Sequence, residues 1–351
     1  MRVSKSVKIK NITIGAGNKI AVQSMTNTDT LDSEATLAQL LALQSGGCDI
    51  GRIAVSSDDE VRSCTKIIGK TDMPLVADIQ FDYRLAVKCC EIGFDKIRFN
   101  PGNIGDESKV KILVDACKAH GVPIRIGVNT GSLEKDLIGK PPSDALVESA
   151  LRNVRLLEKF GFYDTVISVK SSDVKTTVDA YRKLSNSVDY PLHLGVTESG
   201  TDLRGIVRSA IGIGSLLADG IGDTVRVSLS GDPVKEVEAA RLILQEAGVD
   251  RNYCEIISCP TCSRCKYDLK STVDALKDAT KHITVPIKVA VMGCVVNGPG
   301  EARDADFGVA GGGADKVALF IKGKVVKTID SSQILPELMK LIEQKVGDCN
   351  E

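Results

Sequence analysis

Residues 96–100 read Lys96-Ile97-Arg98-Phe99-Asn100, in which polar and apolar side chains alternate. In an extended strand, Ile97 and Phe99 share one face while Arg98 and Asn100 share the other. Two later segments divide in the same way: Arg125, Gly127 and Asn129 oppose Ile124, Ile126 and Val128, and Thr224, Arg226, Ser228 and Ser230 oppose Val225, Val227 and Leu229. If the apolar faces meet helices, the polar faces turn inward, which predicts a barrel with a charged interior.

Strands of this kind recur along the first 250 residues. Eight β-rich segments alternate with amphipathic segments of helical period, as in successive βα units. The expected strands are 21–25, 50–55, 74–79, 96–100, 123–129, 165–170, 191–197 and 224–230, and helices such as 108–120 and 234–247 follow them. The pattern predicts an α/β fold, a (β/α)8 TIM-like barrel. A doubly wound sheet is the alternative, but no GxGxxG follows the first strand.

Charged residues fall on the inward face of five expected strands. Arg52, Arg98, Arg125, Lys170 and Arg226 would converge there, with Asp78 and Glu198 as counter-charges. A buried charge loses its hydration unless it is paired. The surplus of cations therefore predicts an anionic ligand, phosphate or diphosphate, at the C-terminal mouth of the barrel. The alternative is a set of structural ion pairs that line the barrel.

The pattern changes in the last hundred residues, where we expect a small α+β domain. Strands are expected at 253–258, 285–292, 316–321 and 324–329, and helices at 267–281 and 332–346. We accordingly divide the chain into a barrel domain, residues 1–250, and a second domain, residues 251–351.

Cysteines in the second domain have the spacing of metal ligands. Cys259 and Cys262 form a CxxC pair, Cys294 follows at a distance, and Glu301 comes after a glycine-proline turn. A tight pair with a distant soft ligand is typical of an iron-sulfur cluster or a zinc ion, although a zinc ribbon prefers two compact knuckles. Cys265 extends the pair to CxxCxxC, so spacing alone leaves the fourth ligand ambiguous.

Composition narrows the class of protein. A formal net charge of -1, with 43% hydrophobic and 26% charged residues, is that of an ordinary soluble globular protein, which excludes a polyanion-coating or membrane-surface role. No apolar stretch is long enough to cross a bilayer, and we expect a cytoplasmic protein with no nucleic-acid or membrane partner. Its eleven cysteines are expected to be reduced. Five of them should be small buried hydrophobes, Cys48, Cys64, Cys89, Cys90 and Cys117.

Taken together, several segments resemble the bacterial family of 4-hydroxy-3-methylbut-2-enyl diphosphate synthase. In the barrel the matching segments are Val22-Gln23-Ser24-Met25-Thr26, Ala77-Asp78-Ile79-Gln80-Phe81-Asp82-Tyr83-Arg84, Arg98-Phe99-Asn100-Pro101-Gly102-Asn103-Ile104-Gly105, Arg125-Ile126-Gly127-Val128-Asn129, Thr197-Glu198-Ser199-Gly200 and Gly222-Asp223-Thr224-Val225-Arg226-Val227-Ser228. In the second domain the segment is Met292-Gly293-Cys294-Val295-Val296-Asn297-Gly298-Pro299-Gly300-Glu301-Ala302. The resemblance spans nearly the whole chain in the same order.

The resemblance implies an iron-sulfur oxidoreductase of isoprenoid biosynthesis. Its reaction would be the reductive ring opening and dehydroxylation of 2-C-methyl-D-erythritol 2,4-cyclodiphosphate by two electrons passed through a 4Fe-4S cluster. Cys259, Cys262 and Cys294 match the family's cysteine ligands, and Glu301 matches its carboxylate ligand on the fourth iron. Cys265 is then expected to be a bystander.

The resemblance also implies a set of substrate-binding residues. These are Arg52, Asp78, Arg98, Asn100, Arg125, Asn129, Lys170, Thr197, Arg226, Ser228 and Asn297. Glu198 is expected to be the acid/base group, although its place in the alternation requires a strand end or a bulge. Gln80 stands where the family commonly carries His, and an amide cannot give up a proton at neutral pH. His193 is expected to be a satisfied core histidine.

Partners follow from the same resemblance. The family uses flavodoxin or ferredoxin as electron donor, and in its head-to-tail homodimer the cluster domain of one subunit caps the barrel of the other. Two rival hypotheses are a barrel transferase of the pterin-synthase type with a structural metal, and an electron-carrying or metal-dependent binding module.

Overall fold

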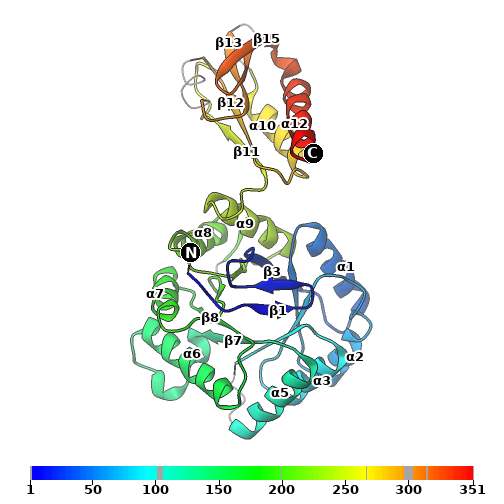
Figure 1. The fold of residues 1–351 in the computed structure, drawn as a ribbon, viewed down its shortest axis with the longest axis vertical. Helices are drawn as coiled ribbons and strands as arrows, with labels where there is room; N and C mark the ends of the chain where they lie inside the picture. Colours follow the sequence, from blue (N-terminus) through cyan, green and yellow to red (C-terminus); the bar gives the residue numbers. More distant parts are fainter. Residues whose placement is uncertain are drawn as a thin grey trace. The chain divides into compact units, whose positions relative to one another are not determined.

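The structure, a computed structural model, describes residues 2–100, 106–198, 200–265, 267–295, 303–313 and 315–350. Contacts between Cα atoms divide the chain into two compact units, Met1–Val249 and Asp250–Glu351. In Figure 1 the first unit runs from blue to green and the second from yellow to red. Each unit is described by itself below.

Eight parallel strands form the centre of the first unit. In chain order they are β3 (Ala21–Met25), β4 (Ile50–Ala54), β5 (Leu75–Asp78), β6 (Lys96–Phe99), β7 (Ile124–Asn129), β8 (Thr165–Lys170), β9 (His193–Leu194) and β10 (Thr224–Val225). The sheet order is β8-β7-β6-β5-β4-β3-β10-β9. A parallel bridge from Ile167 to Leu192 joins β8 to β9 and closes the sheet. The expected (β/α)8 barrel is confirmed.

Helices connect these strands and surround the barrel (Figure 1). They are α1 (Ser33–Ser45), α2 (Asp58–Cys64), α3 (Tyr83–Ile92), α5 (Glu107–His120), α6 (Pro142–Lys159), α7 (Val174–Ser185), α8 (Asp202–Ala218) and α9 (Pro233–Glu246). Five of them begin with an aspartate whose carboxylate accepts a backbone N–H of the first turn: Asp32, Asp82, Asp106, Asp173 and Asp232. Such caps satisfy donors that a helix start leaves unpaired.

The apolar faces of the strands pack against the helices. Ile97, Phe99, Ile124, Ile126 and Val225 are all fully buried in one core with side chains of the helices. Because successive residues of a strand point to opposite faces, the polar residues between them point into the barrel. The alternation at residues 96–100 therefore separates a helix-facing apolar side from an inward-facing polar side, as predicted.

A short antiparallel hairpin covers one end of the barrel. It consists of β1 (Val7–Ile9) and β2 (Ile12–Ile14), and Figure 1 shows it lying across the ring of strands. Its side chains share a small core with residues at the amino ends of the barrel strands, Ala21, Ile50, Val76 and Val166. The hairpin is therefore an apolar plug at the base of the barrel. The sequence analysis did not predict it.

The last two barrel strands are shorter than predicted. β9 ends at Leu194 and β10 at Val225, although strands were expected to extend to residues 197 and 230. The backbone comes unusually close at this point, because a Cβ on Gly195 would lie 2.6 Å from the carbonyl oxygen of Arg226. Regular pairing ends here, so the residues that follow form the loops at the mouth.

Within its described residues, the second unit contains a five-stranded mixed sheet and two helices. The sheet order is β11-β12-β13-β14-β15, for β11 (Cys254–Ser258), β12 (Ile287–Met292), β13 (Phe307–Gly313), β14 (Lys316–Ile321) and β15 (Lys324–Asp330). α10 (Leu269–Thr280) and α12 (Ile334–Asn350) supply Leu276, Leu338 and Ile342 to its core. The α+β fold is confirmed, and β13 is a strand that the sequence analysis missed.

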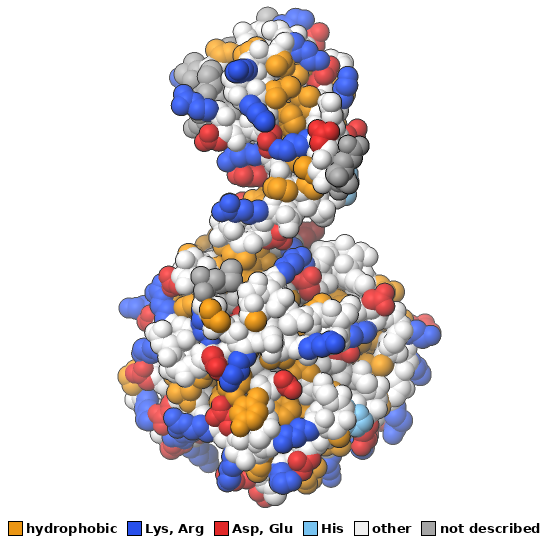
Figure 2. Space-filling model, viewed as in Figure 1, with side chains coloured by type: hydrophobic (Ala, Val, Ile, Leu, Met, Phe, Trp, Pro, Cys, Tyr) orange, Lys and Arg blue, Asp and Glu red, His pale blue; other side chains and the backbone are white. Residues whose placement is uncertain are grey.

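The surface agrees with the near-neutral composition. Basic and acidic side chains are interspersed on the face of the molecule that Figure 2 shows. The five barrel cysteines from Cys48 to Cys117 are buried, as predicted. No helix in the described part of the chain is long and apolar enough to cross a membrane.

Candidate functional site

The pairing register stacks the inward side chains of the barrel in layers, each drawn from alternate strands. From the hairpin towards the carboxyl ends, one layer holds Gln23, Val76, Arg125 and His193, and the next holds Arg52, Arg98, Ser168 and Arg226. Above them follow a layer of Met25, Asp78, Gly127 and Gly195, and a layer of Ala54, Asn100, Lys170 and Ser228. The five cations expected from the sequence therefore share a few adjacent layers of one barrel.

Asp78 is the acidic centre of these layers. Its carboxylate accepts a hydrogen bond from Arg98 Nη1 at 2.8 Å and lies 3.7 Å from Arg52 Nε. Burial raises the pKa of Asp78, but the attraction of Arg52, Arg98 and Arg125 outweighs burial and leaves the pKa below its ordinary value. One carboxylate is thus shared among several guanidinium groups, and their positive charge exceeds its negative charge.

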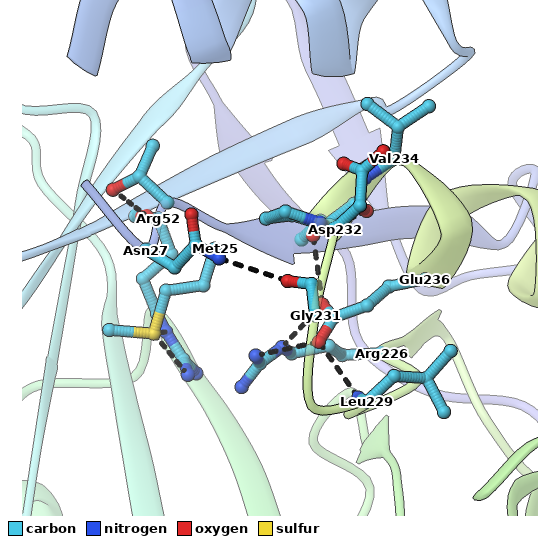
Figure 3. Close-up of polar contacts among 12 residues, drawn as sticks. Met25, Asn27, Arg52, Arg226, Leu229, Gly231, Asp232, Val234 and Glu236 are labelled. Atoms are coloured by element: carbon cyan, nitrogen blue, oxygen red, sulfur yellow. Dashed lines mark hydrogen bonds and ion pairs between the residues drawn. The ribbon is translucent and has the colours of Figure 1, made fainter. Parts of the chain in front are cut away.

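Arg52 has an unusual neighbour. Its Nε and Nη2 atoms lie 3.0 and 2.8 Å from the sulfur of Met25, as Figure 3 shows. A thioether sulfur is a weak acceptor, so much of the hydrogen-bonding capacity of this guanidinium is left for another ligand. Burial and the neighbouring charge of Arg226 lower the pKa of Arg52 to about 9, which still leaves it protonated at neutral pH.

Arg226 is paired with a buried carboxylate that the sequence analysis missed. Its Nη2 and Nε atoms lie 3.3 and 3.4 Å from the two oxygens of Glu236, on α9. The same carboxylate accepts a hydrogen bond from Ser24 Oγ at 2.9 Å. It also accepts one from the backbone N–H of Leu229 at 2.9 Å (Figure 3). Glu236 therefore holds Arg226 and the loop after β10 in place.

Two glycines make room for two of the cations. A Cβ on Gly127 would lie 2.4 Å from Arg98 Nε, and one on Gly195 would lie 2.6 Å from Lys170 Nζ. No side chain could occupy either position without moving the cation beside it. Arg98 Nη2 also donates to the carbonyl of Gly127 at 3.2 Å. Burial and the charges of Arg125 and Arg226 lower the pKa of Lys170 well below its usual value.

The remaining barrel candidates lie at or near the carboxyl ends of the strands. Asn100 is buried and Nδ2 lies 3.5 Å from two oxygens of Ser132, while Asn129, Thr197 and Ser228 are half-buried. Glu198 follows β9 by four residues, is exposed and has a positive φ of 51°. The strand end that its assignment required is therefore present. Gln80 is exposed.

His193 is only half satisfied by its surroundings. Its Nδ1 lies 2.7 Å from Thr224 Oγ1, while Nε2 has no hydrogen-bond partner among the described residues. Burial and the charges of Lys170, Arg125 and Lys96 lower its pKa well below the usual value, so the ring is neutral at neutral pH. The expectation of a core histidine is right, but its hydrogen bonding is incomplete.

In the second unit, the cysteines gather where two adjacent parallel strands end. Cys259 follows β11 and Cys294 comes two residues after β12, and these strands pair along their length. The backbone N–H of Gly293 donates to Cys259 Sγ at 3.2 Å. Cys265 lies against the same glycine, because a Cβ there would be 2.8 Å from its sulfur. The two strand ends therefore bring Cys259, Cys265 and Gly293 together.

Backbone and aromatic groups support this region. The backbone N–H of Arg264 donates to Cys262, which is exposed, and lowers its pKa. Cys265 Sγ donates to the carbonyl of Tyr267, and Tyr267 Oη donates to the carbonyl of Met292 at 3.0 Å. Tyr267 thus ties the cysteine loop to the end of β12.

The donor set fits a thiolate-held metal centre. Thiolates bind iron-sulfur clusters, and backbone N–H groups that donate to sulfur are typical of such sites. Within the described ranges, no three His, Cys, Asp or Glu side chains already stand close enough together to hold a metal ion. Two predicted site residues, Asn297 and Glu301, lie outside the described residues.

These features define an enzyme built on a (β/α)8 barrel with a cation-rich interior, followed by an α+β unit whose cysteines are compatible with a metal centre. Residues 4–241 match the model of the GcpE TIM-barrel domain, and residues 255–344 match that of the GcpE protein C-terminal domain. The chain belongs to the GcpE family of 4-hydroxy-3-methylbut-2-en-1-yl diphosphate synthases. The family expected from the sequence is therefore confirmed.

Relatives with the name 4-hydroxy-3-methylbut-2-en-1-yl diphosphate synthase (flavodoxin) match almost the whole chain. The protein of Caldanaerobacter subterraneus subsp. tengcongensis is 54% identical over 350 residues, covering 99% of this chain and 98% of the relative. That of Clostridium perfringens is 52% identical over 343 residues, covering 97% of this chain and 98% of the relative.

Among solved structures, the barrel is similar to dihydropteroate synthases. That of Stenotrophomonas maltophilia has a TM-score of 0.53 and 17% identity, and covers 70% of this chain and 99% of its own. That of Coxiella burnetii has a TM-score of 0.51 and 14% identity, and covers 70% of this chain and 100% of its own. At this identity the similarity shows the fold alone, so it does not support the rival hypothesis of a pterin transferase.

Proposed function

We propose that this chain reduces 2-C-methyl-D-erythritol 2,4-cyclodiphosphate to 4-hydroxy-3-methylbut-2-enyl diphosphate, with residues 1–250 binding the substrate and residues 251–351 holding a 4Fe-4S cluster. Two electrons open the ring, and the departing hydroxyl takes up a proton and leaves as water. The observation that carries the proposal is the convergence of five cations inside one barrel of a family member, where Asp78 is shared by Arg52, Arg98 and Arg125. Lys170 and Arg226 are the other two, and Arg226 is paired with Glu236.

The barrel residues bind and orient the diphosphate. Arg98, Arg125 and Arg226 supply charged donors, and guanidinium forks match phosphate oxygens in geometry. Arg52 and Lys170 add positive charge, and Asn100, Asn129 and Ser228 add neutral donors nearer the mouth. Asp78 fixes the guanidinium groups of Arg98 and Arg52, and Thr197 orients the substrate. A buried cation without enough acidic partners is unfavourable, because it has lost its hydration. Binding the diphosphate would supply the missing negative charge, which is why it would bind here.

Cys259, Cys262 and Cys294 would hold the cluster together with Glu301, and Asn297 would contact the substrate beside it. When bound, the cluster supplies the two electrons of the reduction. The N–H of Gly293 donates to Cys259 Sγ, and the N–H of Arg264 donates to Cys262 and lowers its pKa. Cys265 is proposed to remain a thiol, since its sulfur already donates to the carbonyl of Tyr267 at 3.2 Å.

Glu198 is proposed to hold the proton that the departing hydroxyl takes up. It lies at the barrel mouth on an exposed turn with a positive φ. Because it is beyond the end of the strand, the alternation of the strand does not fix the direction of its carboxyl group. Gln80 lies at the same mouth and can donate a hydrogen bond, but its amide does not release a proton at neutral pH.

The spectrum of anaerobically purified protein tests the cofactor. We expect about four irons and four sulfides per chain, brown colour and a Mössbauer signal with one iron distinct from the others. Turnover of the cyclic diphosphate should require reduced flavodoxin, the donor in the names of the relatives, with ferredoxin as the alternative. A colourless protein that contains zinc would rule the proposal out.

Two variants test the fourth ligand. Glu301→Ala should keep a cluster but lose nearly all turnover, because a carboxylate there would be the exchangeable ligand that makes way for the substrate. Cys265→Ser should change the iron content and the turnover little. We assign Glu301, rather than Cys265, as the fourth ligand. Equal loss of iron in both variants would contradict this assignment.

A homodimer is proposed in which the cluster of one subunit serves the barrel of the other. Mixing subunits that carry Arg98→Ala with subunits that carry Cys259→Ser tests it, because each variant is inactive by itself. If the site is shared between subunits, half the dimers regain one site, and activity returns to about a quarter of the wild-type value. If cluster and barrel act within one subunit, the mixture stays inactive. In the control, subunits that carry Arg155→Ala replace those that carry Arg98→Ala. Arg155 is an exposed arginine.

A further inference from the structure

Glu236, on α9, is a buried carboxylate whose acceptor positions are all taken by the protein. It is 4% exposed. Its Oε1 atom accepts hydrogen bonds from the backbone N–H of Leu229 at 2.9 Å and from Arg226 Nη2 at 3.3 Å. Its Oε2 atom accepts from Ser24 Oγ at 2.9 Å and from Arg226 Nε at 3.4 Å. An ionised carboxylate offers about four acceptor positions, so Glu236 has none left for a substrate atom.

The ion pair uses one particular edge of the Arg226 guanidinium. Nε and Nη2 form the edge that faces Glu236, as Figure 3 shows. The other edge, Nη1 with the second N–H of Nη2, is not used by this pair. A planar guanidinium can hold one oxyanion on each edge. The orientation of Glu236 therefore decides the direction in which Arg226 offers its second edge.

Glu236 is itself held from two sides. Ser24 belongs to β3 and is 0% exposed, so its hydroxyl ties one carboxylate oxygen to the barrel wall. The N–H of Leu229 ties the other oxygen to the loop that follows β10. Further along the same loop, Asn27 Nδ2 donates to the carbonyl of Gly231 at 2.9 Å (Figure 3). The barrel wall and the loop thus set the direction of the carboxylate before any ligand arrives.

The charge of Glu236 would by itself oppose the binding of an anion. A carboxylate beside the cations repels a diphosphate and cancels part of their attraction for it. A favourable contribution of Glu236 to substrate binding must therefore come from orientation. A guanidinium that is already aligned loses less conformational freedom when the anion binds.

We propose that Ser24 and Glu236 are positioning residues for the substrate: Ser24 fixes Glu236, and Glu236 turns the Nη1 edge of Arg226 toward the diphosphate. The inference rests on the proposed function, in which Arg226 binds that diphosphate. Ser228, another proposed ligand of the substrate, directly precedes the residue whose N–H donates to Glu236, so the same carboxylate also anchors the chain beside Ser228.

Glu236→Asp separates position from charge. It keeps the negative charge but shortens the side chain by one methylene, which withdraws the carboxylate from contacts with Arg226 that are already 3.3 and 3.4 Å long. In isothermal titration of the oxidised, anaerobic holoenzyme, the Kd of the cyclic diphosphate should rise about tenfold. In turnover, KM should rise with it while kcat stays within about twofold of the wild type, because the lost interaction is one of binding. Glu238→Asp, exposed on the same helix, is the matched control and should bind like the wild type.

The opposite pattern is expected if Glu236 acts through its charge alone. Glu236→Asp would then bind like the wild type, and Glu236→Gln would bind more tightly because a repelling charge is gone. That pair of results would overturn the proposal.

Arg226→Ala tests the route of the effect. If Glu236 acts through Arg226, adding Glu236→Asp to Arg226→Ala should raise Kd by less than about twofold further. A full tenfold cost in that background would overturn the proposal. A wild-type Kd in Arg226→Ala alone would refute the proposed substrate site, and this inference with it.

Ser24→Ala is the second variant, and it decides should Glu236→Asp fail to fold. It keeps both charges of the ion pair but removes the anchor of the carboxylate on β3. Its Kd should rise about threefold, a smaller effect because the N–H of Leu229 still holds the other oxygen. A Kd equal to that of the wild type would count against the role of both residues.

Discussion

A single methyl group at Gly127 should weaken substrate binding, even though glycine has no side chain to contact the substrate. In Gly127→Ala, the new Cβ would lie 2.4 Å from Arg98 Nε and 2.9 Å from its Nη2. Distances this short cannot persist, so the guanidinium must move. Arg98 would then lose its hydrogen bond to the carbonyl of Gly127, at 3.2 Å, and its alignment with Asp78, at 2.8 Å.

The size of the effect follows from what Arg98 contributes. A hydrogen bond from a charged group contributes about 1.5–3 kcal/mol, and a displaced guanidinium should lose about 2 kcal/mol of its interaction with the diphosphate. That loss corresponds to an increase of about 30-fold in Kd. Isothermal titration of the oxidised protein with the cyclic diphosphate, under anaerobic conditions, measures it directly.

Two comparisons isolate the cause. Gly214→Ala, in α8, places a Cβ that has nothing within 4 Å, so its Kd should equal that of the wild type. In an Arg98→Ala background the clash is absent, so adding Gly127→Ala should cost nothing more. The reasoning is refuted if Gly127→Ala binds within about twofold of the wild type, or if its cost is the same with and without Arg98.

Three further predictions concern stability and the cysteine loop. Glu236→Gln leaves the half-buried Arg226 beside an uncharged group and should lower the free energy of unfolding by about 3 kcal/mol in urea, whereas exposed Glu238→Gln on the same helix should change it little. Because the pKa of Asp78 is depressed in the folded state, its stabilising contribution is present above the ordinary aspartate pKa and is lost as the pH falls through the folded value. Asp78→Asn should therefore flatten the fall of Tm with pH below about pH 4, and an unchanged acid limb would contradict the charge network. Tyr267→Phe frees the carbonyl of Met292 and should speed the loss of iron during anaerobic gel filtration, while Tyr163→Phe, 56% exposed, should retain iron like the wild type.

The barrel could be predicted because its strands combine two independent constraints. Helices must cover the outer face, so residues such as Ile97 and Ile126 have to be apolar, and the residues between them carry the charges of the interior. The two-residue alternation therefore identifies Arg98 and Arg125 as inward-facing residues. Lys96 obeys the same period and is fully buried, but a lysine at the start of a strand is easily interpreted as exposed.

Other features leave weaker traces in the sequence. The hairpin strands are three residues each, too short for a clear alternation. β13 is rich in glycine because its neighbours come close: a Cβ on Gly308 would lie 2.3 Å from the ring of Phe320. Glycine usually indicates a turn, so this strand was missed. Glu236 lies on a helix, where a charge flanked on the same face by Pro233 and Ala240, both buried, was the available sign of an inward role.

The hairpin across the base of the barrel also constrains the order of events during turnover. Val7, Ile9 and Ile14 close the lower end of the barrel among the described residues, so we expect substrate and product to share the opening at the opposite end. Product therefore has to vacate before the next substrate arrives. A non-reactive analogue of the product should accordingly compete with the substrate at every concentration and never bind alongside it.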